Sequence, residues 1–420
     1  MSTLILNTGR EKSLLRHHPW IFSGAIDRVD GDPAPGETVD VLSSRGDFLA
    51  RAAYSPQSQI RARVWTFDPF ESVDADFLHR RVHHAIASRA SLLPGEEPGV
   101  SSAALRLIHA ESDGLPGLIV DRYADTLVAQ FLTAGADAWR ATIADLLLEL
   151  TGLKNLYERS DADVRELEGL PPRTGPLRGD PPLVSRIAEH GLQFKVDIAA
   201  GHKTGFYLDQ RENRALVQQL AKDREVLDCF SYTGGFTINA LAGGAISVLS
   251  IDSSAEVLAL CRENVGLNWS EINSLESSVT GHPAAATRPP SAITPHTTLE
   301  GDVFQLLRTF RDQGRSFDMV ILDPPKFAPT AAQAEKASRG YKDINLLAFK
   351  LLRPGGILVT FSCSGGVDAA LFQKIVASAA LDAGVVGQII GYLSQAPDHP
   401  VALNFPEGMY LKGLVCLKVR

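Results

Sequence analysis

Hydrophobic and polar positions change their spacing twice along this chain of 420 residues. Near the start, stretches such as 37–42 and 60–65 alternate apolar and polar side chains and are separated by turn residues, the pattern of half-buried strands. This predicts a small β-barrel. Helical spacing over 74–93 and 138–150, mixed with further short strands, predicts a compact α+β unit in the middle.

From about residue 220, apolar strands alternate with helical segments, which is typical of a doubly wound parallel sheet. We therefore predict an α/β protein with three domains: a β-barrel over 1–70, an α+β domain over 71–185 and a Rossmann-like domain over 186–420. The Pro- and Gly-rich run 170–182 predicts a loop or a linker. The run 268–298, rich in Ser, Thr, Pro and Ala, predicts a surface insertion.

Charge and cysteine content narrow the classes of function. The net charge of −8 argues against a general polyanion-binding surface, so nucleic acid would have to meet a local patch. Residues 1–67, with 8 Lys and Arg against 7 Asp and Glu, are the less acidic part. The four cysteines show no metal-binding spacing and no C-x-x-C pair, which suits a reducing compartment. There is no secretory pattern at the start and no apolar run long enough to span a membrane, so we expect a cytoplasmic protein.

Polar groups follow the predicted strands of the last domain at their carboxyl ends. They are Asp228, Asp252, Asp302, Asp323 and Cys363. Because open α/β sheets bind ligands at this edge, we expect a shared site there.

The loop after the first of these strands predicts the kind of ligand. Its Gly234-Gly235 turn lets backbone N–H groups approach a ligand, and Asp252 could accept both hydroxyls of a ribose. The turn alone is equally typical of an ordinary β-turn-α junction. No G-x-G-x-x-G follows the strand, which favours a nucleoside cofactor without phosphates. The rigid Pro-Pro after Asp323 could hold a flat substrate beside it.

Longer motifs point to one family. They are His18-Pro-Trp-Ile-Phe-Ser-Gly24, the segments 106–122 and 203–214, Asp398-His-Pro, and Pro406-Glu-Gly-Met-Tyr-Leu-Lys-Gly413. Over nearly its whole length the chain resembles the RlmI-like family of class I S-adenosylmethionine-dependent methyltransferases, which form 5-methylcytosine in large-subunit ribosomal RNA. The resemblance implies an amino-terminal RNA-binding PUA domain, S-adenosylmethionine as cofactor and ribosomal RNA as partner, and it suggests a homodimer.

The resemblance also implies roles for residues. The cofactor pocket would be lined by Phe206, Gln210, Asp228, Phe230, Gly234, Asp252, Asp302 and Asp323. Asp252 would hold the ribose and Asp302 the adenine amino group. The family runs briefly from the helix after Asp252 to the strand before Asp302, whereas the insertion at 268–298 intervenes here.

Cys363 is the predicted nucleophile. Carbon 5 of cytosine is a poor nucleophile until a thiolate adds to carbon 6, and the thiol must be exposed and partly ionised. Free cysteine is usually a small buried hydrophobe, and we assign Cys229, Cys261 and Cys416 to that class.

Release of the product needs a second group. Many cytosine-5 RNA methyltransferases carry another cysteine after the motif proline, where this chain has Pro325-Lys326. Asp323, Lys326 or a water is then the candidate acceptor of the carbon-5 proton. His399 is either a surface histidine or a residue near the target base.

Two other functions remain compatible with the sequence. Asp-Pro-Pro-x-Phe also resembles motifs of enzymes that methylate a guanine or another base nitrogen without a covalent thiol. The chain could also be a non-catalytic RNA-binding assembly protein, although the intact polar groups at the strand ends argue against it.

Overall fold

A computed structural model describes residues 2–90, 103–269, 272, 295–327 and 333–420. The chain forms two compact units. The first comprises Met1–Ala188, Val196–Asp209 and Pro397–Gly408, and the second comprises Glu189–Lys195, Gln210–Ala396 and Met409–Arg420. Among the described helices, none has the length and apolar character needed to cross a membrane.

The first unit begins with a six-stranded sheet in the order β2-β6-β5-β4-β1-β3. Its strands are β1 (Thr3–Leu6), β2 (Trp20–Phe22), β3 (Ile26–Asp30), β4 (Thr38–Leu42), β5 (Phe48–Tyr54) and β6 (Ile60–Thr66), with the short 3-10 turns η1 (Leu14–Arg16) and η2 (Ser23–Ala25). The strands predicted at 37–42 and 60–65 are confirmed as β4 and β6. Their alternate side chains, such as Val39, Val41 and Val64, form a separate apolar core.

A five-stranded sheet follows in the order β11-β10-β9-β8-β7. Its strands are β7 (Ala104–His109), β8 (Leu118–Tyr123), β9 (Thr126–Phe131), β10 (Asn155–Ser160) and β11 (Arg173–Arg178). The helical elements of this part are α1 (Ala75–Arg89), η4 (Ala110–Asp113), α2 (Ala134–Ala138), α3 (Arg140–Thr151) and α4 (Val164–Leu167). Asp74 caps α1 by accepting the Phe77 N–H at 2.9 Å. The two predicted helices are confirmed, except that 91–93 lies outside the described residues.

The prediction of a loop over the whole run 170–182 is wrong, because the run contains β11. This strand is at the edge of the sheet, and within the described residues its one strand partner is β10. An edge strand tolerates Pro176, since a proline lacks an N–H and the outer side of the strand has no partner to bond. Gly175 has a φ of 135°, a conformation that a residue with a Cβ rarely adopts.

The second unit is built on a seven-stranded sheet in the order β16-β15-β14-β17-β18-β20-β19. The strands are β14 (Glu225–Cys229), β15 (Ser247–Asp252), β16 (His296–Glu300), β17 (Phe317–Leu322), β18 (Leu352–Ser362), β19 (Gly387–Leu393) and β20 (Lys412–Lys418). The first five neighbours pair in parallel, whereas β20 runs antiparallel to both β18 and β19. The doubly wound sheet is therefore confirmed, with one reversed strand near its edge.

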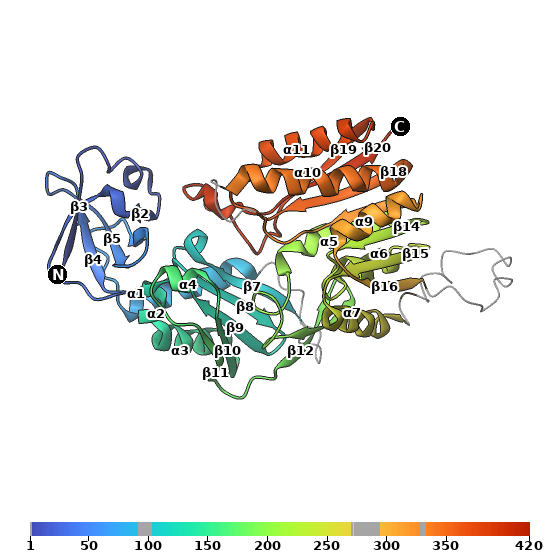
Figure 1. Ribbon diagram of the computed structural model, residues 1–420. Helices are drawn as coiled ribbons and strands as arrows, with labels where there is room; N and C mark the ends of the chain where they lie inside the picture. Colours follow the sequence, from blue (N-terminus) through green and yellow to red (C-terminus); the bar gives the residue numbers. More distant parts are fainter. Residues whose placement is uncertain (1, 91–102, 270–271, 273–294, 328–332) are drawn as a thin grey trace. The chain divides into compact units, whose positions relative to one another are not determined.

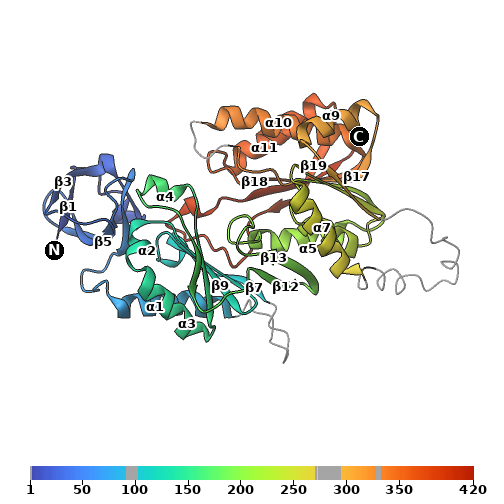
Figure 2. The ribbon, with the colours of Figure 1, turned by 60° about the horizontal axis from the view of Figure 1, so that its bottom comes forward.

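Helices cover both faces of this sheet. They are α5 (Arg211–Leu220), α6 (Gly235–Ala242), α7 (Ala255–Leu267), α9 (Val303–Asp312), α10 (Ala334–Leu351) and α11 (Ala369–Asp382). Helices α9, α10 and α11 lie on one face and α5, α6 and α7 on the other (Figure 1 and Figure 2). The core between the first layer and the sheet includes Leu227, Val320, Tyr341 and Phe372.

Three connections remain. The chain passes from one unit to the other within β12 (Val184–Glu189) and again within β13 (Leu192–Asp197), which form a hairpin. It passes a third time within η5 (Leu208–Gln210). The short turn η8 (Pro406–Gly408) lies in the first unit. Most of the predicted insertion at 268–298 lies outside the described residues, but its last part is not an insertion, because β16 begins at His296 and pairs with β15.

Candidate functional site

The polar groups predicted at the strand ends do come together at one edge of the second unit's sheet. Asp228 is the second-last residue of β14, Asp252 ends β15, and Asp302 follows β16 by two residues. Asp323 and Cys363 directly follow β17 and β18. Because these five strands are adjacent and parallel, their carboxyl ends share one edge, as the sequence predicted.

The loop between β14 and α6 is held in an uncommon conformation. Phe230, Tyr232 and Gly234 have φ values of 62°, 47° and 87°. A Cβ on Gly234 would lie 2.6 Å from the sulfur of Cys261. A glycine is therefore needed at this position both for the positive φ and to avoid this clash. Non-glycine residues with positive φ carry a cost that surrounding contacts must offset, and such residues often mark ligand sites.

Asp252 supplies one of these contacts. Its Oδ2 accepts the Tyr232 N–H at 3.0 Å and its Oδ1 accepts the Ser254 N–H at 3.2 Å. The side chain is only half-buried, and each carboxylate oxygen can accept a further hydrogen bond. Asp252 therefore stabilises the glycine loop and still has capacity to accept bonds from a ligand.

Three buried polar atoms around this loop have no hydrogen-bond partner among the described residues. They are Asp228 Oδ1, Ser231 Oγ and Thr233 Oγ1. An unsatisfied buried polar atom costs about 1–3 kcal/mol. A ligand that brings hydrogen-bond donors would satisfy these atoms, which makes the loop a candidate binding site.

Asp228 is the most perturbed carboxyl group of the site. Burial and the nearby carboxylates of Asp323 and Asp252 together raise its pKa to about 7, although a hydrogen bond from Thr237 acts to lower it. The Thr237 hydroxyl donates to Asp228 Oδ2 at 2.7 Å. At neutral pH, Asp228 is therefore close to half protonated.

Asp323 is connected to the start of α5. The Gln210 Nε2 donates to Asp323 Oδ2 at 3.0 Å, and Asn213 Nδ2 donates in turn to Gln210 Oε1 at 2.6 Å. Asn213 also donates to the backbone carbonyl of Ser394 at 3.0 Å. The predicted cofactor residues Gln210 and Asp323 thus belong to one hydrogen-bonded chain.

In the structure, Asp302 serves as a helix cap. Its side chain caps α9 by accepting the Gln305 N–H at 2.9 Å, and the residue is exposed. Capping uses Oδ1, which leaves Oδ2 able to accept from an adenine amino group. The assignment of Asp302 to the cofactor stays a prediction.

Cys363 differs in environment from the other three cysteines. It is partly exposed, whereas Cys229, Cys261 and Cys416 are buried. Burial raises the pKa of the Cys261 and Cys416 thiols to about 12 and that of the Cys229 thiol well above its usual value. Only Cys363 is placed to react, because the thiolate is the reactive form.

The turn at Cys363 is fixed by its neighbour Ser364. The Ser364 hydroxyl accepts the Phe327 N–H at 3.1 Å and shares a hydrogen bond with the Tyr341 hydroxyl at 2.9 Å. Phe327 ends the Asp323-Pro-Pro-Lys-Phe motif, so the two loops are tied together. The Cys363 sulfur itself lies 4.0 Å from the Pro324 carbonyl oxygen, while Lys326 is exposed.

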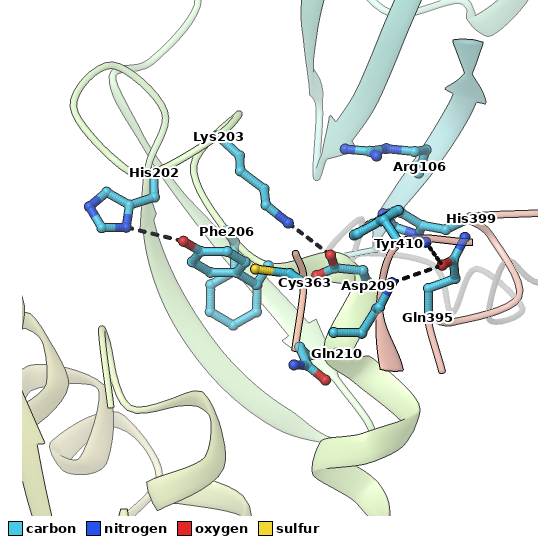
Figure 3. A network of polar contacts seen from close by, with 12 residues as sticks. Arg106, His202, Lys203, Phe206, Asp209, Gln210, Cys363, Gln395, His399 and Tyr410 are labelled. Carbon is cyan, nitrogen blue, oxygen red and sulfur yellow. Dashed lines mark hydrogen bonds and ion pairs between the residues drawn. The ribbon is translucent and has the colours of Figure 1, made fainter. Parts of the chain in front are cut away.

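Phe206 belongs to the first unit, unlike the other predicted cofactor residues. Its side chain is buried and its N–H donates to the Tyr123 hydroxyl at 3.1 Å. The same segment contains an ion pair between Lys203 and Asp209 at 2.8 Å, drawn in Figure 3. These contacts hold the segment 203–209 in place within the first unit. The assignment of Phe206 as a cofactor contact stays a prediction.

His399 is not a surface histidine. It is buried, its Nδ1 lies 2.9 Å from Asp398 Oδ1, and Asp398 Oδ2 accepts the Arg106 N–H at 2.9 Å. Arg106 in turn pairs with Asp121 at 2.7 Å. Burial and the charge of Arg106 lower the pKa of His399, so it is neutral at physiological pH. The Asp398-His-Pro motif thus lies in a buried polar network of the first unit.

The amino-terminal motif is also used internally. The Trp20 Nε1 donates to Glu111 Oε1 at 2.8 Å, and the Trp20 ring packs edge-on against Phe405 at 4.9 Å between centroids. His18 lies 3.2 Å from Glu407. The motifs at His18–Gly24 and Pro406–Gly408 therefore join distant parts of the first unit.

The alternation of residues 60–65 predicts that Arg61 and Arg63 share one strand face and could help residues 1–67 to bind RNA, but the structure does not leave these two side chains free as a basic face. Arg63 is buried and pairs with Glu168 at 2.7 Å, and the Arg61 guanidinium donates to the Pro56 carbonyl. Burial alone would raise the pKa of Glu168, but Arg63 and the hydroxyls of Ser58 and Ser55 lower it. Strand alternation could not reveal this, because the partner Glu168 is far away in the sequence.

Sequence reasoning also missed Tyr341 and Lys412. Tyr341 is buried in the middle of α10, and Lys412 is buried opposite Ser362 in the β18–β20 pair. Lys412 stands inside the quoted motif 406–413, which is the one signal that could have identified it.

Comparisons with known proteins identify the domains and the relatives of the chain. Residues 4–67 match the PUA-like domain family, and residues 173–285 match the S-adenosylmethionine-dependent methyltransferase family. The chain is 49% identical over 414 residues to ribosomal RNA large subunit methyltransferase I of Cronobacter sakazakii, with 98% of each chain covered. The protein of that name from Escherichia coli K12 gives the same identity and coverage.

Solved structures show the same fold at low sequence identity. A candidate SAM-dependent methyltransferase from Streptococcus mutans is 19% identical, with a TM-score of 0.79 over 99% of this chain and 100% of its own. A candidate methyltransferase complexed with SAH is 20% identical, with a TM-score of 0.81 and the same coverage. At such identities the likeness shows the fold alone.

Proposed function

The chain belongs to the ribosomal RNA large subunit methyltransferase I family and is S-adenosylmethionine-dependent, and we propose that it forms 5-methylcytosine in large-subunit ribosomal RNA through a covalent bond to Cys363. The name of the relatives supports ribosomal RNA as the substrate class. The covalent step rests on the site itself, and the choice of cytosine rests on the resemblance to the RlmI-like family.

One observation carries the proposal: Cys363 is the single partly exposed cysteine in the chain, and it directly follows β18 beside the Asp323-Pro-Pro-Lys-Phe loop. Methylation of a base nitrogen needs no thiol. A reactive thiol fixed next to the substrate loop is what carbon-5 methylation of a pyrimidine needs.

The cofactor fits the residues present. When bound, S-adenosylmethionine supplies an electrophilic methyl group. Its ribose hydroxyls and ammonium group are hydrogen-bond donors, and Asp252 and the unsatisfied atoms of Asp228, Ser231 and Thr233 are acceptors that can hold them. Gln210, Phe230 and Gly234 complete the proposed pocket.

The residues of the chain account for each bond. The Cys363 thiolate forms the bond from sulfur to carbon 6, and the displaced electron pair makes carbon 5 nucleophilic. Carbon 5 would take the methyl group as the bond between that group and the cofactor sulfur breaks, which would leave a neutral thioether. Asp323, Lys326 or a water bound by them then accepts the carbon-5 proton. The electron pair of that C–H bond restores the ring double bond, and the bond from carbon 6 to sulfur breaks to regenerate the thiolate.

The base must leave its stack to reach Cys363, as in other enzymes that act on a base. Asp323 and Lys326 lie on the loop that the Ser364 hydroxyl ties to the cysteine turn. The proton acceptor and the nucleophile are therefore held on two joined loops.

The test uses RNA that contains 5-fluorocytosine, because fluorine cannot be removed by a base and the covalent adduct persists. We expect a protein–RNA band that survives denaturing electrophoresis with the parent protein and with Cys229→Ala, Cys261→Ala and Cys416→Ala. Cys363→Ala should give no band. Normal carbon-5 methylation by Cys363→Ala would refute the covalent mechanism.

Mass-spectrometric analysis of ribosomal RNA nucleosides decides the chemistry of the product. A methylated guanine or another base nitrogen, formed equally well by Cys363→Ala, would establish the non-covalent alternative. Absence of any methylated base together with intact RNA binding would establish a non-catalytic assembly protein.

A further inference from the structure

Lys412 is a buried ammonium group beside the cysteine turn. The residue is 7% exposed. The Nζ donates to the backbone carbonyl oxygens of Ser364 and Tyr410, both at 2.8 Å. Lys412 begins β20 and pairs with Ser362, the last residue of β18, so its side chain reaches the residues that flank Cys363.

This ammonium has no carboxylate within ion-pair distance in the described part of the chain. Two carbonyl dipoles alone are a poor replacement for water around a full positive charge. Burial accordingly lowers the pKa of Lys412 to about 8, and the charge of Lys326 lowers it too, while the Cys363 thiolate and Asp368 raise it. Most of the Lys412 side chains are still charged at pH 7.

The other charged and titratable groups around Cys363 come from three elements. Lys326 belongs to the loop after β17, Tyr341 belongs to α10, and Asp368 caps α11 by accepting the Leu371 N–H at 2.7 Å. Asp323 begins the loop that contains Lys326. Among these groups, Lys412 is the buried cation bound to the turn itself.

We propose that Lys412 is a positioning residue whose ammonium group is the counter-charge of the Cys363 thiolate and fixes the turn that presents the sulfur. An opposite charge nearby favours the ionised form of a thiol. Among the described residues, no carboxylate gives Lys412 a negative partner. When the Cys363 thiol releases its proton to water, the resulting thiolate supplies that negative charge. This deepens the proposed function and rests on it for its catalytic consequence.

The test measures alkylation of Cys363 by iodoacetamide against pH in the full-length protein, read by peptide mass spectrometry. Lys412→Met should move the half-maximal pH upward by about one unit, which is roughly a tenfold loss of alkylation rate at pH 7. Lys412→Gln keeps hydrogen-bond donors without charge and should behave in the same way. Lys412→Arg keeps the charge and should restore most of the parent profile.

Lys418 provides a matched control on the same strand. Its Nζ also donates to two backbone carbonyls, those of Phe349 and Leu352, at 2.9 and 2.6 Å. Lys418→Met removes the same kind of contact at the other end of β20 and should leave the alkylation profile unchanged. A parent-like profile for folded Lys412→Met and Lys412→Gln would overturn the inference.

The two proposals fail separately. Alkylation reports ionisation of the thiol whether or not Cys363 attacks a base. If Lys412→Met shifts the profile but Cys363→Ala still methylates carbon 5, the covalent mechanism is wrong and the charge pairing stands. If Cys363 is essential but the profile does not shift, Lys412 is not the counter-charge.

Discussion

Asp228→Asn should remove a large pH dependence from the stability of the protein. The folded pKa of Asp228, about 7, lies above its ordinary value of 3.8 because the carboxyl group is buried and near other carboxylates. Between pH 4 and 7 the unfolded chain releases this proton while the folded chain keeps it. The folded state therefore loses stability as pH rises through this window, and the loss levels off above pH 7.

The size of the effect follows from the shift. Each pKa unit corresponds to about 1.4 kcal/mol, so the complete loss between pH 4 and 8 is on the order of 4 kcal/mol. Asparagine has the shape of aspartate and stays neutral throughout. We expect the free energy of unfolding of Asp228→Asn, relative to the parent, to increase by several kcal/mol across the window.

Urea unfolding at pH 4.5, 6 and 8 measures this difference. Asp302→Asn is a control, because Asp302 is an exposed helix cap. A parent-to-variant difference that is flat with pH, or that changes in the opposite direction, would refute the assignment of a raised pKa to Asp228.

The same raised pKa predicts a proton linked to cofactor binding. S-adenosylmethionine carries a sulfonium and an ammonium group, and positive charge in the pocket favours the ionised carboxylate. At pH 7 about half a proton should be released per cofactor bound. Calorimetry in buffers of different ionisation enthalpy counts this proton, and Asp228→Asn should release none from this site.

The remaining predictions concern the ribose contact, the RNA surface and the buried ion pair. Asp252→Ala should weaken cofactor binding roughly ten- to hundredfold, on the order of 1.5–3 kcal/mol, and unchanged affinity in calorimetry would contradict the ribose assignment. Lys12 and Arg16, exposed near η1, should contact RNA phosphates. The double variant Lys12→Glu with Arg16→Glu should weaken RNA binding and flatten its salt dependence, while the cofactor affinity stays the same. An unchanged dependence of RNA binding on salt would contradict a role for these two residues. Arg63→Met leaves Glu168 buried and unpaired, so urea unfolding should show a loss of about 3–5 kcal/mol; a loss below about 1 kcal/mol would contradict the role of this pair.

The parallel sheet and its polar edge could be predicted because both depend on local pattern. A run of apolar residues that ends in Asp252 or Asp323 defines a strand and its end at once, and adjacent parallel strands must bring their ends to one edge. The cysteine contrast was predictable for a related reason: Cys261 and Cys416 stand in apolar segments, whereas Cys363 stands between serines.

The errors all involve partners that are distant in the sequence. Arg63 looked like part of an exposed strand face, but its partner Glu168 is more than a hundred residues away. A surface position was one of two expectations for His399, and it is wrong because the neighbouring Asp398 is bonded to the distant Arg106 in a buried network. The strand β11 was missed because Pro176 and Gly175 argue against a strand everywhere except at a sheet edge, and edge position is a property of the complete sheet.

The order of the strands explains how one edge can serve two opposite charges. Asp252 ends β15, Asp228 lies one residue before the end of β14, and Asp323 directly follows the neighbouring strand β17, which makes that part of the edge negative. Cys363 and Lys412 lie at the next strands, β18 and β20. A methyl donor that carries a positive sulfonium is favoured beside carboxylates, whereas a thiolate beside those same carboxylates would be disfavoured. Separating the groups along the sheet lets a cationic cofactor and an anionic nucleophile be stabilised at the same time. The reversed strand β20 contributes to this arrangement, because its antiparallel direction brings its first residue, Lys412, to the edge where the parallel strands end.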